Sequence, residues 1–226
     1  MTVWLFYTFT SLFFSSTDRQ PPAFNQSDRS SQWLVRPAKL EDVAGVAEIL
    51  ADSFHAREGV FSWAYPLLRL GIYEDIRNRL RSNSQHHVCL VAFDAATTVG
   101  DNSYTSDRVV GTVEMNVRSH IGGTNYLYLG NNHLNRQYPY LSNLAVHSSY
   151  RRQGVAAQLL LSCEGIALSW GVGDLYLHVL ENNHSARQLY FKLGYKLYEV
   201  DSNWSTWLLR RPRQLLLHKR MNSATP

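Results

Sequence analysis

A junction between a predicted strand and a predicted helix constrains this chain most. Residues 140–146 have the pattern of a strand, and residues 153–170 have apolar side chains spaced along one face of a helix. Between them lies the stretch R-R-Q-G-V-A-A at 151–157. The first backbone N–H groups of a helix have no acceptor within the helix, and they converge where the helix dipole is positive. The junction therefore predicts an anion-binding turn.

The side chains of this turn suit a pyrophosphate. Gly154 has no Cβ to keep an anion away from the backbone, and Ala156 has the next smallest side chain. Arg151 and Arg152 add positive charge. The same residues also fit an ordinary helix start with solvated arginines, so the turn by itself leaves both interpretations open.

The composition fits one globular domain with flanking tails. The chain has 226 residues, of which 45% are hydrophobic and 18% are charged. Its net charge of +4 suits anionic ligands, but the basic residues are scattered, so we expect no nucleic-acid partner. We also expect no membrane span, because no run approaches the roughly 18 apolar residues that a membrane helix needs.

Cysteines and histidines indicate neither disulfides nor a metal site. Cys89 and Cys163 fall in a predicted strand and a predicted helix, so we expect two buried thiols in a reducing compartment. The histidines lack metal-ligand spacing. His86 and His87 are expected to lead, exposed to solvent, into a strand.

Three segments are predicted. Residues 1–32 are an N-terminal extension, disordered or loosely docked, with a targeting segment or a membrane-touching aromatic anchor as the alternatives. Residues 33–221 form the domain, and 222–226 are a tail. Two long polar connections, 118–137 and 201–212, are candidates for deciding substrate choice.

The hydrophobic periodicity predicts the order β-α-α-β-β-β-α-β-α-β-β, an α/β (α+β) fold with a mixed central sheet of six to seven strands. We expect antiparallel pairing in the first half and parallel pairing in the second. The second helix should be broken or bent by Pro66 and Gly71. The predicted strands are 33–36, 88–93, 109–117, 140–146, 175–180, 195–200 and 215–221, and the helices are 40–54, 62–80, 153–170 and one capped by Asn182 and Asn183 that ends at Gly194.

Two motifs make residues 33–221 resemble the Gcn5-related N-acetyltransferase (GNAT) superfamily. The first is N-L-A-V at 143–146 followed by R-x-x-G-x-A at 151–156, and the second is N-x-x-A-x-x-L-Y-x-x-x-G-Y at 183–195. The stretch 175–195 is similar to the subgroup found in cyanobacteria and plastids. The resemblance implies the GNAT fold and transfer of an acetyl group from acetyl-CoA directly to an amine, without a metal.

The resemblance also implies which residues contact acetyl-CoA. The backbone of a splayed strand would hold the pantetheine arm, the turn would hold the pyrophosphate, and an asparagine would hydrogen-bond the arm. In this chain the corresponding positions are Leu144, Ala145, Val146, Arg152, Gln153, Gly154, Val155, Ala156, Ala157 and Asn183.

The catalytic positions follow from the same resemblance. Tyr190 occupies the position of the general acid that would protonate the leaving thiolate, although it also fits a core aromatic. His178 stands where relatives that acetylate a ribosomal protein carry a glutamate, and it is the candidate base. Glu114 is the competing base, and a histidine bonded within the sheet or a solvated edge glutamate are the plain alternatives.

The acceptor is expected to be a protein or peptide amine, either a lysine side chain or an amino terminus. A small amine or amino acid is the second possibility, and a non-catalytic acyl-CoA sensor is the third. The resemblance places the protein in a cyanobacterial cytoplasm or a plastid stroma. The sequence predicts no oligomeric state.

Overall fold

A computed structural model of the chain describes residues 33–54, 65–82, 84, 86–94, 108–118, 138–201 and 212–221. The predicted extension 1–32, the tail 222–226 and nearly all of the two polar connections lie outside the described residues. The strands are β1 (Trp33–Pro37), β2 (His87–Asp94), β3 (Val109–Arg118), β4 (Tyr138–Val146), β5 (Asp174–Leu180), β6 (Lys196–Asp201) and β7 (Gln214–Arg220). The α-helices are α1 (Val43–Phe54), α2 (Tyr65–Arg81), α3 (Val155–Ser169) and α4 (His184–Lys192), and none of them is long and apolar enough to cross a membrane.

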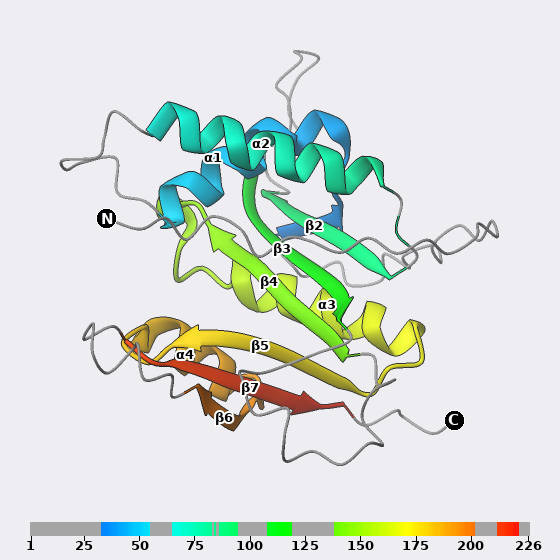
Figure 1. Cartoon of the computed structure of the whole chain (residues 1–226), viewed down its shortest axis with the longest axis vertical. Helices are drawn as coiled ribbons and strands as arrows, with labels where there is room; N and C mark the ends of the chain where they lie inside the picture. Colours follow the sequence, from blue (N-terminus) through cyan, green and yellow to red (C-terminus); the bar gives the residue numbers. More distant parts are fainter. Residues whose placement is uncertain are drawn as a thin grey trace.

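One seven-stranded sheet runs through the molecule in the order β1-β2-β3-β4-β5-β7-β6 (Figure 1). Helices α3 and α4 cover one face, and α1 and α2 cover the β1–β4 part of the other (Figure 1). The alternation of β3 explains the layers, because Val113 and Met115 enter the core beneath α3 while Glu114 points to the opposite face. Cys89 and Cys163 are buried free thiols, as predicted.

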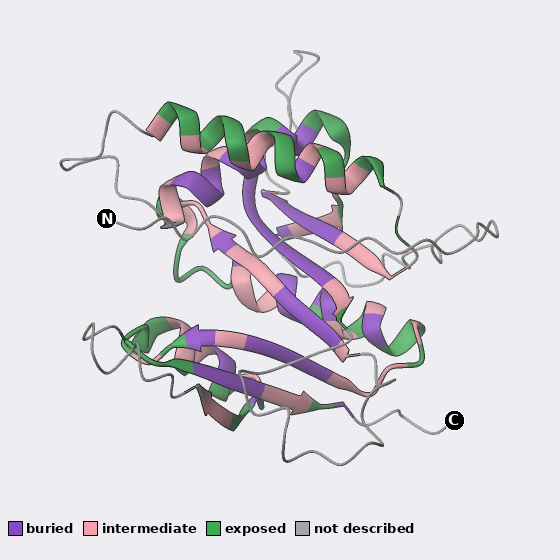
Figure 2. Cartoon of the chain, viewed as in Figure 1, coloured by how far each residue is buried: buried purple, intermediate pink, exposed green. Residues whose placement is uncertain are grey.

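Helix α2 is continuous, so it is not broken at Pro66 or Gly71, and a bend there stays a prediction. Pro66 is the second residue of α2, where its missing N–H would have no helical acceptor. Among the described residues, a Cβ at Gly71 would meet nothing within 4 Å. The outer side of α2 is largely exposed (Figure 2).

The second half of the sheet was expected to be parallel, but only one of its strand pairs is. β4 and β5 are parallel, as their crossover through α3 predicts. β6 does not pair with β5, because β7 lies between them and is antiparallel to both. The last strand of the chain thus enters the sheet one place inside its edge.

β4 and β5 separate along their length, and this separation positions the candidate site. The described ladder between them has two residue pairs, Tyr140 with Tyr176 and Leu141 with Leu177. β5 continues to Leu180 in pairing with β7, and β4 continues to Val146 in pairing with β3. The β4 edge that faces β5 is therefore outside this ladder over residues 142–146.

Candidate active site

A bulge interrupts β4 two residues after its last described pair with β5. In the β3–β4 register, Glu114 faces Ser142 and Thr112 faces Ala145, so two residues of β4 stand opposite one of β3. One of these two, Asn143, has a φ of 53°, which is in the left-handed region. The bulge changes the direction of the strand end that follows it.

The predicted pantetheine positions are Leu144, which is the second residue of the bulge, and Ala145 and Val146, which follow it. Ala145 and Val146 resume the pairing with β3, and the Ala145 side chain is buried in the core beneath α1. Leu144 and Val146 are half-buried and pack against the core beneath α3. Their side chains are thus structural, and the backbone edge toward β5 is the part of these residues that a ligand can use.

The predicted anion-binding turn has two left-handed residues. Arg152 has a φ of 65° and Gly154 a φ of 91°. Helix α3 begins at Val155, two residues later than predicted, with Gly154 as its N-cap. The N–H groups of the first turn of α3, which belong to Val155, Ala156 and Ala157, have no acceptor within the helix. A helix start of this kind can bind an anion.

Neighbouring groups hold the turn in place. The indole of Trp33 donates to the carbonyl of Gln153 at 2.9 Å, and the side-chain amide of Gln153 donates to the carbonyl of Ser149 at 2.9 Å. The Arg152 guanidinium donates to the hydroxyl of Ser185 at 2.8 Å, which links the turn to the start of α4. The turn is thereby fixed to both β1 and α4.

Asn183 is the N-cap of α4, as predicted. Its side-chain oxygen accepts from the backbone N–H of Ala186 at 3.2 Å. The side-chain NH₂ takes no part in this cap, so a second hydrogen bond from Asn183 to a ligand is compatible with it.

Tyr190 lies on α4 with 7% of its surface exposed, and its ring is 5.8 Å from that of Tyr195. Burial raises the pKa of the Tyr190 phenol to about 12, with a smaller contribution from Tyr140 on β4. Tyr190 belongs to the buried core that also contains Leu141 of β4 and Val179 of β5.

His178 on β5 is paired with a residue that the sequence did not single out. The hydroxyl of Tyr140 on β4 lies 2.8 Å from Nδ1 of His178, and which group donates depends on the tautomer of the imidazole. The Arg118 guanidinium lies 3.7 Å from the centre of the Tyr140 ring. Burial raises the pKa of Tyr140, although Arg118 and His178 oppose the rise. The only sequence signal for Tyr140 was its place on the strand adjoining that of His178.

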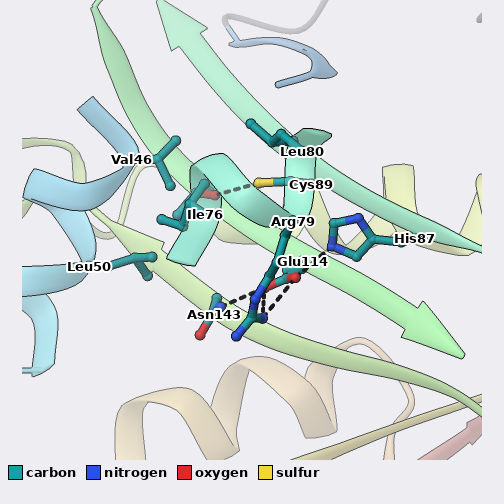
Figure 3. Close-up of a pocket in the computed structure, with 10 residues that line it drawn as sticks. Val46, Leu50, Ile76, Arg79, Leu80, His87, Cys89, Glu114 and Asn143 are labelled. Atoms are coloured by element: carbon teal, nitrogen blue, oxygen red, sulfur yellow. Dashed lines mark hydrogen bonds and ion pairs between the residues drawn. The ribbon is translucent and has the colours of Figure 1, made fainter. Parts of the chain in front are cut away.

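Glu114 lies one strand further from β5, beneath α2 (Figure 3). It is 3% exposed, so the solvated edge position considered above is wrong. Arg79 of α2 donates to both carboxylate oxygens at 3.0 Å, and Nε2 of His87 lies 2.6 Å from Oε1. The side-chain amide of Asn143 donates to Oε2 at 2.6 Å. Four elements therefore meet at one carboxylate.

This environment makes Glu114 a poor proton acceptor. Burial alone would raise its pKa, but the hydrogen bond from His87 and the charge and hydrogen bonds of Arg79 outweigh burial and lower the pKa to about 2. His87 is largely buried in this contact, so its predicted exposure is wrong. The pocket beside the cluster has a volume of about 10 Å³, which is room for about one water molecule.

The chain is similar in sequence to known acetyltransferases. The profile of the acetyltransferase (GNAT) family matches residues 60–195. GCN5-related N-acetyltransferase 10, chloroplastic, from Arabidopsis thaliana is 28% identical over 195 residues, which cover 84% of this chain and 73% of that protein. GCN5-related N-acetyltransferase 7, chloroplastic, from the same plant is 37% identical over 78 residues, which cover 34% of this chain and 28% of that protein.

Solved structures share the fold. Arabidopsis thaliana NAA60 in complex with acetyl-CoA has a TM-score of 0.60 and 18% identity, and the match covers 84% of this chain and 99% of that one. The PaiA N-acetyltransferase of Thermoplasma acidophilum in complex with coenzyme A has a TM-score of 0.58 and 18% identity, with the same two coverages. These similarities confirm the fold that the two sequence motifs predicted.

Proposed function

Because the chain belongs to the acetyltransferase (GNAT) family, we propose that it moves the acetyl group of acetyl-CoA to a primary amine of a protein, either a lysine side chain or an amino terminus. Structures with the same fold contain coenzyme A or acetyl-CoA, which supports this cosubstrate. One of them, Arabidopsis NAA60, has also been solved with a bisubstrate analogue. When bound, acetyl-CoA supplies the thioester carbon that the amine attacks.

The observation that carries the proposal is the early separation of β4 and β5. The turn at 151–157 follows β4, and the side chains of His178, Asn183 and Tyr190 lie on β5 or on the segment that follows it. The turn residues Arg152 to Ala157 would hold the pyrophosphate through the backbone N–H groups of α3 and the charge of Arg152. Within the described part of the chain, the atom nearest to a Cβ built at Gly154 would be Trp33 Nε1 at 4.0 Å, so these residues leave room beside the glycine. The residues present therefore fit the coenzyme.

The backbone beyond the bulge would bind the arm and the thioester oxygen. Leu144, Ala145 and Val146 offer the strand edge that lies outside the β4–β5 ladder. Backbone N–H donors that are fixed before the reaction stabilise the charge that develops on the thioester oxygen. Asn183 would donate its remaining amide hydrogens to the arm.

His178, paired with Tyr140, would take the proton of the attacking amine. An imidazole can accept a proton near neutral pH, directly or through a water molecule. The hydrogen bond to Tyr140 fixes the orientation of the ring on the sheet face opposite α3 and α4. Glu114, with a pKa of about 2, is much the weaker base.

Tyr190 would donate a hydrogen bond to the leaving sulfur. Because burial raises its pKa to about 12, the phenol remains protonated at the pH of the reaction. Complete transfer of its proton to a thiolate whose pKa is about 8.5 would be uphill. Tyr190 therefore acts chiefly as a hydrogen-bond donor that stabilises the departing sulfur.

We also propose that the protein works in the plastid stroma. The support is that its curated relatives in Arabidopsis thaliana are named as chloroplastic. A fluorescent fusion of the full chain tests this location. A signal confined to the cytosol of a plant cell would contradict it.

Mass spectrometry tests the reaction and the class of acceptor together. The purified chain is incubated with acetyl-CoA and a peptide library that offers free amino termini and lysines, and in parallel with a panel of small amines. We expect acetylated peptides with the parent and few with Tyr190→Phe. Acetylation restricted to the small amines would contradict the protein acceptor, and acetyl-CoA binding without any transfer would indicate a sensor.

A further inference from the structure

We propose that Glu114 is a positioning residue for acetyl transfer: it holds Asn143 in the β4 bulge and thereby fixes the backbone that follows. This inference rests on the proposed function, because that backbone is the part of β4 assigned to the coenzyme. Glu114 does not touch the reacting atoms in this account. Its effect passes through one hydrogen bond, from Asn143 Nδ2 to Glu114 Oε2.

The backbone of Asn143 has a conformation that needs support. Its φ of 53° is unfavourable for a residue with a Cβ, and Asn is among the few residue types that adopt it routinely. A residue with a Cβ and without such support would return to the extended region and remove the bulge. The 2.6 Å bond to Glu114 connects the side chain of Asn143 to the neighbouring strand and holds the left-handed conformation.

Glu114 is itself held from two other elements. Arg79 of α2 contacts both of its oxygens, and His87 of β2 contacts one of them (Figure 3). The carboxylate is buried and charged, so these bonds are strong and restrict its position. Asn143 is thus bonded to a group that cannot easily move.

The place of the bulge connects this network to the reaction. The last described pair between β4 and β5 is Leu141 with Leu177, and the bulge follows two residues later. Leu144 is the second residue of the bulge, and Ala145 and Val146 come directly after it. A change in the φ of Asn143 would therefore rotate the N–H groups proposed to face the thioester, and misplacement by about 1 Å can cost about 100-fold in rate.

Two substitutions of Asn143 separate its backbone role from any role of its amide. Asn143→Gly removes the bond to Glu114 but permits a positive φ, whereas Asn143→Ala removes the bond and disfavours that φ. For kcat/KM with acetyl-CoA, we expect Asn143→Gly to stay within about threefold of the parent. We expect Asn143→Ala to lose at least about tenfold. Equal losses in both variants, or no loss in Asn143→Ala, would overturn the inference.

A double-mutant cycle tests the part played by Glu114. Glu114→Met keeps the length of the side chain but removes the carboxylate, and Arg79 retains its ion pair with Asp75 at 2.6 Å. We expect at least about a tenfold loss of kcat/KM in the parent background and less than about threefold in the Asn143→Gly background. The pH profile should keep its shape. The same loss in both backgrounds, or loss of a limb of the profile, would assign Glu114 a direct role and overturn the inference.

Two controls keep these results interpretable. Circular dichroism and thermal unfolding establish whether each variant is folded. If Glu114→Met does not fold, the comparison of Asn143→Gly with Asn143→Ala tests the inference without it. Calorimetric titration of the parent with acetyl-CoA, together with its transfer activity, tests the proposed function separately. A parent that neither binds nor transfers overturns that function. An active parent whose Asn143 variants do not differ overturns only the inference about Glu114.

Discussion

The hydroxyl of Tyr140 lies 2.8 Å from Nδ1 of His178 across the parallel pair β4 and β5. This bond joins the two strands next to the point at which their ladder ends. It places an imidazole and a phenol together on the sheet face opposite α3 and α4. In the proposed mechanism, this pair accepts the proton of the amine beside the edge proposed for the thioester.

Removal of this pair should slow transfer and alter its pH dependence. We expect His178→Ala to lower kcat/KM by about 100-fold and to abolish the acidic limb of the pH profile, because a water molecule must then accept the proton of the amine. Tyr140→Phe should give a smaller loss and a shifted limb. His86→Ala is a suitable control, since His86 packs against Trp170, away from the pair. An unchanged profile in His178→Ala would contradict the assignment of the base.

Removal of the Tyr190 hydroxyl should affect the departure of the thiolate. We expect Tyr190→Phe to lower kcat by about 100-fold or more while the affinity for acetyl-CoA is retained. Tyr195→Phe provides the matched control, because the buried Tyr195 hydroxyl has no hydrogen-bond partner within the described part of the chain. Its removal should leave kcat unchanged. Steady-state kinetics that show equal losses in the two variants would argue against a specific role for Tyr190.

Gly154 should matter through its backbone conformation. Gly154→Ala introduces a side chain at a φ of 91° and should cost about 1–2 kcal/mol in local strain. We expect a higher KM for acetyl-CoA because the turn relaxes away from the pyrophosphate. Gly171→Ala carries comparable strain at a φ of 74° beyond the other end of α3, where a Cβ meets nothing within 4 Å among the residues that the structure describes. It should reduce stability without changing KM. An unchanged KM in Gly154→Ala, or a raised KM in Gly171→Ala, would contradict the role of the turn.

The cluster around Glu114 should make the protein sensitive to acid. The pKa of Glu114 is lowered from its ordinary value of 4.5 to about 2, so the ionised form stabilises the folded state. This contribution, about 3 kcal/mol, is complete above pH 4.5 and is lost as the pH falls toward about 2. Chemical unfolding across this range should show a smaller loss of stability in Glu114→Met than in the parent. Parallel curves for the two proteins would contradict the depressed pKa.

Local sequence patterns predicted much of the fold and the elements on which several candidate site residues lie. The turn with Gly154, the cap at Asn183 and the position of Tyr190 on α4 depend on residues that are near one another in the chain. For that reason the spacing of small, polar and apolar residues was sufficient to predict them. The start of α3 was misplaced by two residues because the left-handed Arg152 and Gly154 delay the helix.

Contacts between distant residues were not predictable in this way. The charge cluster joins Glu114 to Arg79, 35 positions earlier, and to Asn143, 29 positions later. The pairing of Tyr140 with His178 depends on which strands become neighbours. The insertion of β7 between β5 and β6 likewise follows from the packing of the complete sheet and has no local signature.

A crystal structure of the chain with acetyl-CoA tests the central claim most directly. The account predicts that the pyrophosphate lies against the N–H groups at the start of α3, the arm runs along Leu144 to Val146, and the sulfur lies within hydrogen-bonding distance of the Tyr190 hydroxyl. A pyrophosphate bound away from Gly154, or a Tyr190 hydroxyl turned away from the sulfur, would contradict the account.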